Sequence, residues 1–254
     1  MEKQLIRRFK NTFAEIPKWA WDFKPPIPLI GQQYKPGKSL LIYASAENLS
    51  WLHDTETPPR FSGEEEAWNR YRIRYEQTGR RSDSFFPDVG IQPVSDGGLF
   101  AAGLFVSQKF GLPVRSKPRT FLEQIAVSNW CKFSIKSTTN RDYINDIKKL
   151  TESLPFVIGE LALLQPKVVL VPKAIWKRPL LRAAMHGASP ETLFLPVPQF
   201  NATVVNTHLK KYDRPAAKLK RQHRSTPLAV WMDNLSRLNK NHAWRYLAML
   251  EATS

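Results

Sequence analysis

One segment, residues 125–141, joins an apolar run to polar side chains that could do chemistry. Its sequence is IAVSNWCKFSIKSTTNR, which predicts a buried strand over residues 125–128 that leads into a polar, basic loop. Folds with parallel sheets bind their ligands at the carboxyl ends of the strands. Asn129 is expected at such an end, where its amide offers donors and an acceptor suited to the edge of a nucleobase. The alternative, a turn residue that bonds its own loop, stays open.

The charge of the chain narrows the class of partner. The 254 residues include 38 Lys and Arg but only 22 Asp and Glu, a formal net charge of +16. Such an excess favours a polyanionic partner, above all nucleic acid, although an inert basic surface would have the same composition. With 42% hydrophobic residues, the chain can bury the core of one large domain.

The cysteine content limits the redox and metal chemistry. Cys131 is the single cysteine, so the chain has no internal disulfide and no cysteine-built zinc or iron–sulfur site, and we expect no cofactor. Without a histidine partner in sight, Cys131 is expected to be a small packed residue. The start, MEKQLIRRFKNTF, lacks the apolar run of a signal peptide, and no segment has the roughly 20 apolar residues of a membrane span. We therefore expect a cytoplasmic protein that does not contact membranes.

Apolar runs and turn signals alternate along the chain. The expected strands are residues 39–45, 121–128, 166–171 and 192–195. The expected helices include residues 63–75, 98–110, 142–152 and 156–164, the last two separated by Pro155 because a proline normally breaks a helix. This alternation predicts an α/β sandwich with a mainly parallel sheet.

The domain organisation follows from the same signals. Residues 1–38, with turns at Pro25-Pro26 and Pro36-Gly37, are expected to be an extension that packs on the core, and residues 39–254 a single domain. That domain includes a basic segment, residues 208–224, and a C-terminal helix, residues 226–250, that opens with Thr226 as its cap and Pro227 in its first turn.

Several segments, taken in order, resemble the uracil-DNA glycosylase superfamily over about residues 39–206. The run SNWCKFSIKSTTNR resembles the family's TNVVKCRP…NR segment, most closely that of the iron–sulfur branch. Asn129 takes the place of the asparagine that reads the target base, and Lys132, Asn140 and Arg141 match as well. The run LLIYASAENLS falls where the family carries its water-activating motif, and LPVPQFN where it carries the HPSP loop that presses into the minor groove. Between them, IGELALLQPKVVLVPKAIW looks like the helix and strand before that last motif.

The resemblance implies a three-layer α/β/α sandwich with a central, mainly parallel four-stranded sheet, and a monomeric enzyme that acts on double-stranded DNA. The sequence departs from the family where catalysis is concerned. Ala44 stands in the glycine position of the first motif, Ser45 in its carboxylate position and Leu195 in the catalytic histidine position, and the cluster cysteines are missing. The expected target is therefore a non-standard or modified base, for example a bulky modified cytosine of phage DNA removed in antiviral defence.

A glycosylase needs a carboxylate near the sugar cation and a positioned water, and Glu47 is the only carboxylate in the first loop. Glu47 is expected to stabilise the sugar cation, Asn48 to position water and Ser45 to hold a water. A solvated or helix-start acid is the alternative for Glu47. Phe85 and Phe86 are expected to stack on the flipped base, unless they belong to the core.

Further residues are expected to contact DNA. Phe200 and Asn201, after Pro198 in the last motif, are candidates for the wedge that fills the vacated stack. His208 either replaces the missing imidazole or contacts phosphate. The remaining residues expected to contact DNA are Lys132, Arg141, Lys210, Lys211 and Arg214. For the last three the alternative is that the basic run is only a solvated face.

Three other functions fit parts of the sequence. A catalytically inactive relative that binds DNA would have the same charge and the same missing catalytic residues. A conventional repair glycosylase for uracil or another deaminated base would keep the resemblance. An enzyme that processes bases or nucleotides on a similar sheet would not need the basic run, and its affinity for substrate would not depend on salt.

Overall fold

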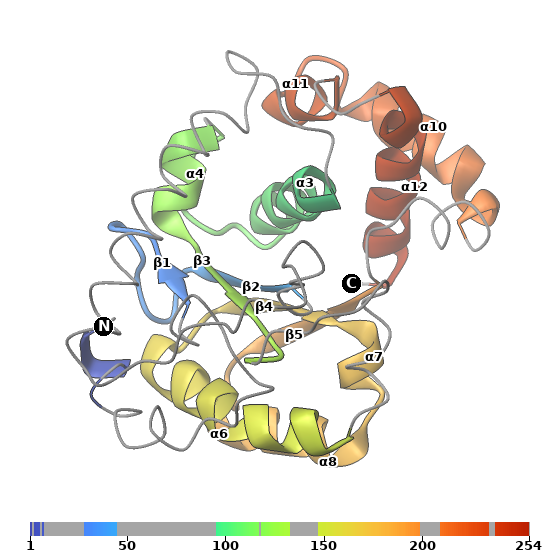
Figure 1. Cartoon of the computed structure of the whole chain (residues 1–254). Coiled ribbons are helices and arrows are strands. Elements are labelled where there is room, and N and C mark those ends of the chain that lie inside the picture. The colour runs from blue at the N-terminus through green and yellow to red at the C-terminus, as the bar shows by residue number, and fades with distance from the viewer. Residues whose placement is uncertain are drawn as a thin grey trace, which may run out of the picture. The chain divides into compact units, whose positions relative to one another are not determined.

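The computed structural model describes residues 1, 3–5, 7, 28–44, 95–116, 118–132, 147–198, 209–233 and 237–253 (Figure 1). The chain divides into two compact units, each made of two separate segments. The sheet unit comprises Met1–Thr78 and Ile125–Pro196, and the helical unit comprises Gly79–Gln124 and Val197–Ser254.

The sheet unit is built on a five-stranded mixed sheet in the order β1-β3-β2-β4-β5. Its strands are β1 (Leu29–Ile30), β2 (Leu40–Ala44), β3 (Ala126–Asn129), β4 (Val168–Pro172) and β5 (Leu193–Val197). Strand β2 runs parallel to β3 and β4, whereas β1 pairs antiparallel with β3. The α/β class is confirmed. The expectation of four strands is corrected, because the two residues of β1 lie in the expected N-terminal extension and pair at the sheet's edge.

Composition explains why β2 and β4 lie inside the sheet. Both strands are almost wholly apolar, LLIYA and VVLVP, and nearly every residue in them is buried, as is typical of strands covered on both faces. Strand β3 instead alternates between buried and half-buried residues. The first part of the expected strand 121–128 is wrong, because residues 121–124 end helix α4 (Pro118–Gln124). That helix opens with a proline, which suits the first helical turn.

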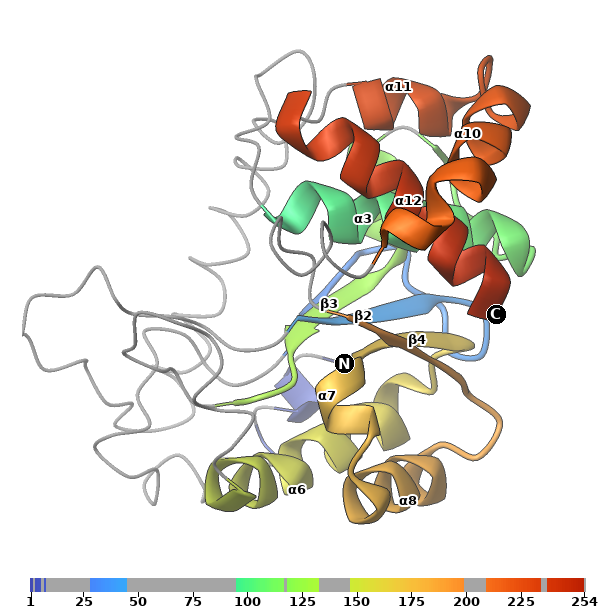
Figure 2. The ribbon, with the colours of Figure 1, turned by 90° about the vertical axis from the view of Figure 1, so that its right-hand side faces the viewer.

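Helices α6 (Ile147–Leu164) and α8 (Pro179–Ala188) pack against one another on one face of the sheet, and the short α7 (Lys173–Trp176) connects β4 to α8 (Figure 2). Helix α6 continues through Pro155, so the expected break there is wrong. A proline cannot bond the carbonyl four residues earlier, here that of Thr151. Both Pro155 and Thr151 are exposed, so water can reach that carbonyl and the core-facing side of the helix is left intact.

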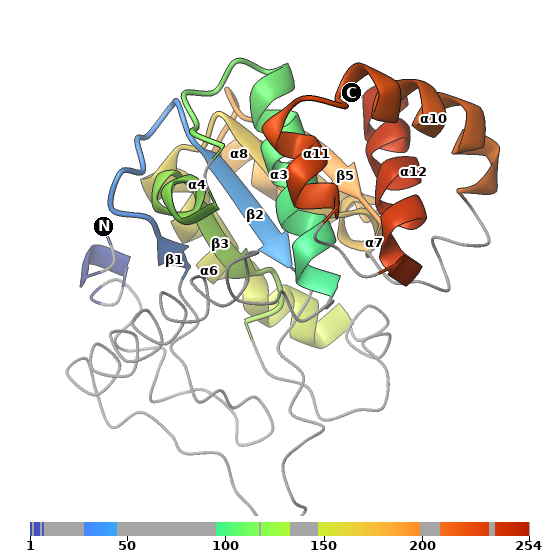
Figure 3. The same cartoon turned by 90° about the horizontal axis from the view of Figure 1, so that it is seen from above.

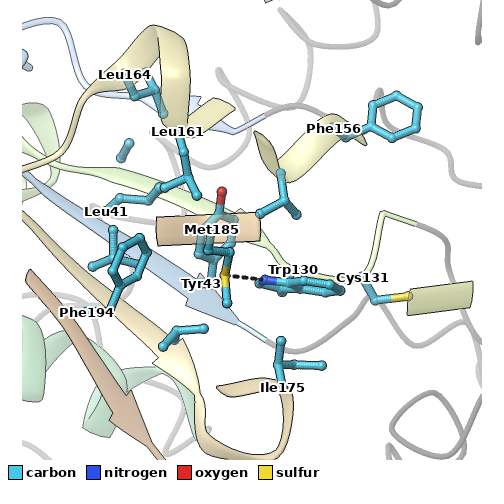
Figure 4. Close-up of a cluster of buried hydrophobic side chains, with 14 of the residues drawn as sticks. Leu41, Tyr43, Trp130, Cys131, Phe156, Leu161, Leu164, Ile175, Met185 and Phe194 are labelled. Carbon is cyan, nitrogen blue, oxygen red and sulfur yellow. Dashed lines mark hydrogen bonds between the residues drawn. The ribbon is translucent and has the colours of Figure 1, made fainter. Parts of the chain in front are cut away.

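The core of the sheet unit lies between the sheet and these helices (Figure 4). Leu41 and Tyr43 of β2 contribute to it, together with Phe156 and Leu161 of α6. Trp130, directly after β3, is fully buried there, and its indole N–H donates to Sδ of Met185 in α8 at 3.3 Å. Burying the indole with a partner anchors the chain immediately beyond the end of β3.

The helical unit contains α3 (Ser95–Lys109), α4, α10 (Asp213–Gln222), α11 (Pro227–Asp233) and α12 (Arg237–Thr253), with a 3₁₀ turn η3 (Lys210–Tyr212) before α10 (Figure 3). Helix α3 confirms the expected helix 98–110. The expected C-terminal helix 226–250 corresponds to α11 and α12, with residues 234–236 outside the described part. Helix α12 packs against α3 and α10. Among the described helices, none combines the length and the apolar character needed to cross a membrane.

Candidate functional site

The topology of the sheet indicates that a site lies at the carboxyl ends of the parallel strands. From β2 the chain crosses to β3 on one side, and from β3 it crosses to β4 on the other side of β2. In open α/β sheets, ligands bind outside the carboxyl ends of the strands where the order reverses in this way. The three parallel strands end at Ala44, Asn129 and Pro172, so these residues mark the candidate site.

Asn129 lies at the tip of β3, as expected from the sequence. Its register partner in β2 is Ala44, and the backbone N–H of Trp130 donates to the carbonyl of Ala44 at 2.9 Å. Ser128 and Trp130 are buried, whereas Asn129 is half-buried. Because successive side chains of a strand point to opposite faces, the Asn129 amide points away from the face on which the Ser128 hydroxyl meets α6.

Lys132 does not occupy a DNA-facing position, which corrects the expectation that it contacts DNA. Its side chain is 1% exposed, and its ammonium forms an ion pair with the fully buried carboxylate of Glu160 in α6. The same Nζ atom donates to Oγ of Ser128 at 2.7 Å, and the backbone N–H of Lys132 donates to Oγ of Ser153 at 3.0 Å. A buried ammonium is held by such partners because an unpaired one would be very costly.

Tyr43 completes this buried polar cluster from β2. Its hydroxyl donates to Oε2 of Glu160 at 2.8 Å, and Nζ of Lys132 lies 5.5 Å from the centre of its ring. Burial raises the pKa of Glu160, and Lys132 works against that shift together with the bonds from Tyr43 and Ser128. The pKa of Tyr43 is raised well above its ordinary value by burial and by the Glu160 carboxylate beside it.

Glu160 is the member of this cluster that the sequence interpretation missed. A signal for it was present in the sequence of α6. Leu150, Phe156, Val157, Leu161 and Leu164 form the buried side of the helix, and Glu160 falls among them at helical spacing. An acid at a core position needs a buried cation, and the basic residue that meets it comes from the end of β3.

Several expected site residues lie outside the described residues. They are Ser45, Glu47, Asn48, Phe85, Phe86, Asn140, Arg141, Phe200, Asn201 and His208. Their expected roles stay predictions.

The described residues around the last motif have mainly structural contacts. Leu195 is buried within β5, and its aliphatic side chain cannot perform the proton transfer of a histidine. Pro198 is half-buried, and its carbonyl accepts a hydrogen bond from the hydroxyl of Tyr246 at 2.9 Å.

Cys131 is buried in the core, with Oγ of Ser153 3.8 Å from its Sγ, which confirms it as a packed residue.

The basic segment forms an exposed surface within the helical unit. All seven of its described Lys and Arg residues are exposed: Lys210, Lys211, Arg214, Lys218, Lys220, Arg221 and Arg224. Helix α10 buries Ala216 and Leu219, and the spacing of Arg214, Lys218 and Arg221 places them on the opposite side. We call these three residues the basic stripe.

The single acid of the basic segment is neutralised within the same unit. Asp213, the first residue of α10, accepts a hydrogen bond from Nε of Arg245 in α12 and forms an ion pair with it. This pair leaves the charge of the segment uniformly positive. Across the described part of the chain, no three His, Cys, Asp or Glu side chains gather as a metal ion would need.

Comparison with protein-family models, with curated proteins and with solved structures gives no significant match. The resemblance to the uracil-DNA glycosylase superfamily therefore depends on the sequence motifs alone.

Proposed function

We propose that this protein is a DNA glycosylase that flips a non-standard or modified base out of double-stranded DNA and excises it. The observation that carries this proposal is the position of Asn129, at the carboxyl end of β3 and opposite Ala44 in β2. An amide at that edge can donate to and accept from a base that has left the stack.

The reaction would break the glycosidic bond between the base and C1′ of its sugar. The base leaves with the bonding electron pair and is protonated, while water supplies the hydroxyl at C1′ and an abasic site remains. Hydrogen-bond donors stabilise the departing base, for which we propose Asn129, and a carboxylate stabilises the cationic sugar. Glu47 has that role in the proposal, with Asn48 and Ser45 as the groups that hold water. All three follow within four residues of Ala44 in the sequence.

The basic segment supplies the contacts with DNA in this proposal. The basic stripe and the neighbouring Lys210 and Lys211 are exposed and face no acid of their own segment, because Arg245 pairs with Asp213. Helix α10, DRPAAKLKRQ, contains no aromatic residue on which single-stranded bases could stack. Its charge therefore favours the phosphates of a duplex, where the charge density is high.

The departures at the catalytic positions favour a target base other than uracil. Leu195 provides no acid or base where the resembled family has a histidine, and Ala44 replaces a glycine, so ordinary uracil excision is not the expected reaction. A bulky modified cytosine of phage DNA, removed in antiviral defence, is the substrate that we propose.

The test is incubation of the purified protein with phage DNA that carries modified cytosines, followed by an assay for abasic sites. Unmodified DNA and uracil-containing duplex are run in parallel. We expect abasic sites in the modified DNA alone, and their loss in the Glu47→Gln variant. If no DNA in the panel gains abasic sites, the glycosylase proposal is wrong, and if only the uracil duplex does, the protein is a conventional repair enzyme.

A second candidate function is DNA binding without catalysis. It is favoured by the basic stripe, which lies far along the chain from Ser45, Glu47 and Asn48 and does not depend on them. In that case the wild-type protein binds duplex DNA with a steep dependence on salt and produces no abasic sites. Glu47→Gln and Asn48→Ala then leave the affinity unchanged.

A further inference from the structure

We propose that Tyr43, Ser128, Lys132 and Glu160 form a positioning network that fixes the β3 tip, so that Asn129 is presented in one orientation. The network extends the proposed function, and it rests on that function only for the statement that Asn129 binds a base. None of its members is exposed, so each would act through Asn129 and not by touching DNA.

The network holds the chain on both sides of Asn129. Ser128, directly before it, lies 3.4 Å from Oε1 of Glu160 through its hydroxyl. Lys132, three residues after it, forms the ion pair with the same carboxylate and donates to Ser128 at 2.7 Å. The five-residue segment 128–132 is therefore closed on itself through two side chains and tied to α6.

The paired strand is tied to the same carboxylate. Tyr43 precedes Ala44, the register partner of Asn129, and its hydroxyl donates to the second oxygen of Glu160 at 2.8 Å. One buried carboxylate thus connects the tips of β2 and β3. The backbone N–H of Lys132 adds a further bond to α6 through Ser153 at 3.0 Å.

The chemistry of the cluster indicates a geometric role. A buried ion pair seldom stabilises a fold more than packed apolar residues of similar volume, because both charges lose their hydration. It does demand fixed partners, since either charge alone in the core is strongly unfavourable. Apolar contacts at the same place would tolerate small displacements of the strand tip, whereas this set of bonds does not.

The decisive variant replaces the network by apolar side chains of similar size, Tyr43→Phe/Lys132→Met/Glu160→Leu. Removing the three polar groups together leaves no buried charge, and the Ser128 hydroxyl keeps the Asn129 carbonyl as a partner at 3.3 Å. The measurements are the thermal unfolding temperature and the hydrogen exchange of the amides of residues 128–132, which needs no substrate.

A matched control is available elsewhere in the sheet unit. Thr192 is buried before β5, and its Oγ1 donates to the carbonyl of Pro166 and lies within hydrogen-bond distance of Oγ of Ser189, both at 2.6 Å. Thr192→Val removes a buried polar group near the start of β4 and β5, away from the tips of β2 and β3. It should leave exchange at residues 128–132 unchanged.

We expect the triple variant to fold and its amides at residues 128–132 to exchange at least tenfold faster than in the wild type. If exchange there is unchanged, or if Thr192→Val accelerates it equally, the positioning network is refuted. Should the triple variant fail to fold, Tyr43→Phe is measured instead, because it removes the bond from β2 to Glu160 and leaves the ion pair with Lys132 in place, and a threefold or greater acceleration is expected.

A measurement of base excision distinguishes a failure of the positioning network from a failure of the proposed function. If the wild type excises modified bases, the triple variant should lose at least tenfold in kcat/KM at an unchanged affinity for plain duplex DNA. Faster exchange in the variant together with an inactive wild type supports the network and refutes the glycosylase. Unchanged exchange in the variant together with an active wild type refutes the network and supports the glycosylase.

Discussion

Neighbouring residues at the end of β3 face two different environments. Ser128 and Lys132 point into a buried polar cluster, whereas Asn129 is half-buried on the other face of the strand. The pleat of the strand separates Asn129 from Ser128, and the ion pair with Glu160 draws the chain beyond it inward. Among the described residues of this tip, the Asn129 amide therefore lies outside the buried polar cluster.

The first prediction concerns the amide of Asn129. We expect Asn129→Ala to lower kcat/KM on modified phage DNA by about a hundredfold, because a site built to bond a polar group loses about 1–3 kcal/mol when that bond is missing. Asn129→Asp keeps the shape but has no N–H donors, and it should be at least as damaging. Abasic-site assays measure both. Unfolding temperatures close to wild type control for misfolding, and full activity of Asn129→Asp would contradict the role.

The second prediction concerns the charge of Glu160. Lys132→Met should lower the unfolding free energy by about 3–5 kcal/mol at neutral pH, because it leaves a buried carboxylate without its cation. Burial already raises the pKa of Glu160 above its ordinary value of 4.5, and loss of Lys132 raises it further. A raised pKa favours folding below pH 4.5, and this contribution is lost as the pH rises through the folded-state value.

The penalty of Lys132→Met should therefore be larger at pH 8 than at pH 5, as measured by urea unfolding. The double variant Lys132→Met/Glu160→Gln has no titrating carboxylate at this position and should show no such difference. A penalty that is equal at both pH values would contradict the burial of an unpaired Glu160.

At the scale of elements, α10 separates its apolar and basic sides. Ala216 and Leu219 hold the helix in the helical unit, and the pair between Asp213 and Arg245 fixes its first turn to α12. The basic stripe is displayed on the side opposite to the buried residues. A helix fixed in this way presents its charges at a constant spacing, which suits a partner with regularly spaced phosphates.

The third prediction concerns the salt dependence of binding to plain duplex DNA. Neutralising the basic stripe with Arg214→Ala/Lys218→Ala/Arg221→Ala should reduce the slope of log K against log salt by about 2.7, because each phosphate contact contributes about 0.9. Fluorescence anisotropy over a range of salt concentrations measures the slope.

The control for the basic stripe removes the same net charge elsewhere. Lys173→Ala/Lys177→Ala/Arg182→Ala changes three exposed cations of α7, α8 and the turn between them. It should change the slope by much less than the stripe variant does. An equal change in both variants would mean that net charge, and not the stripe, determines binding.

Helix α6 shows where local signals mislead at this scale. The rule that proline breaks helices predicts two pieces, yet α6 runs through Pro155 because the carbonyl it cannot bond lies on the exposed side. Burial of Leu150 on one side of the proline and of Phe156 and Val157 on the other holds the helix together. The outcome depends on which face meets solvent, and that is set by tertiary packing.

For the whole molecule, buried tyrosines make stability sensitive to alkaline pH. Tyr34 and Tyr43 are buried in the sheet unit and Tyr246 in the helical unit, and burial raises the pKa of each above its ordinary value of 10.0. The Tyr34 hydroxyl donates to the carbonyl of Leu164 at 3.3 Å. Above pH 10 the unfolded chain loses these protons while the folded units keep them.

The fourth prediction is that the unfolding free energy falls above pH 10 by about 1.4 kcal/mol per pH unit for each buried tyrosine. Tyr34→Phe should remove the contribution of one tyrosine, about 1.4 kcal/mol per pH unit, from the slope of the sheet unit. Tyr246→Phe should remove the same contribution from the slope of the helical unit. Urea unfolding at several pH values, followed together with tyrosinate absorbance, measures it. An unchanged slope in Tyr34→Phe would show that its hydroxyl is not protected from ionisation by folding.

The sequence by itself determined the α/β class, the inner strands β2 and β4 close to their observed bounds, α3, the polar tip at Asn129 and the packed Cys131. These follow from local patterns: apolar runs, turn residues and helical spacing. The basic run was also visible in the sequence, since charge is a property of composition.

Tertiary structure alone decided the antiparallel pairing of β1, the continuity of α6 and the burial of Lys132. Each depends on contacts between residues far apart in the chain, such as the pairing of Leu29 with Val127 and the ion pair of Lys132 with Glu160. A lysine in a polar loop has the local sequence of a surface residue. Only the arrival of a buried carboxylate from α6 makes its burial favourable, because the two charges then satisfy one another.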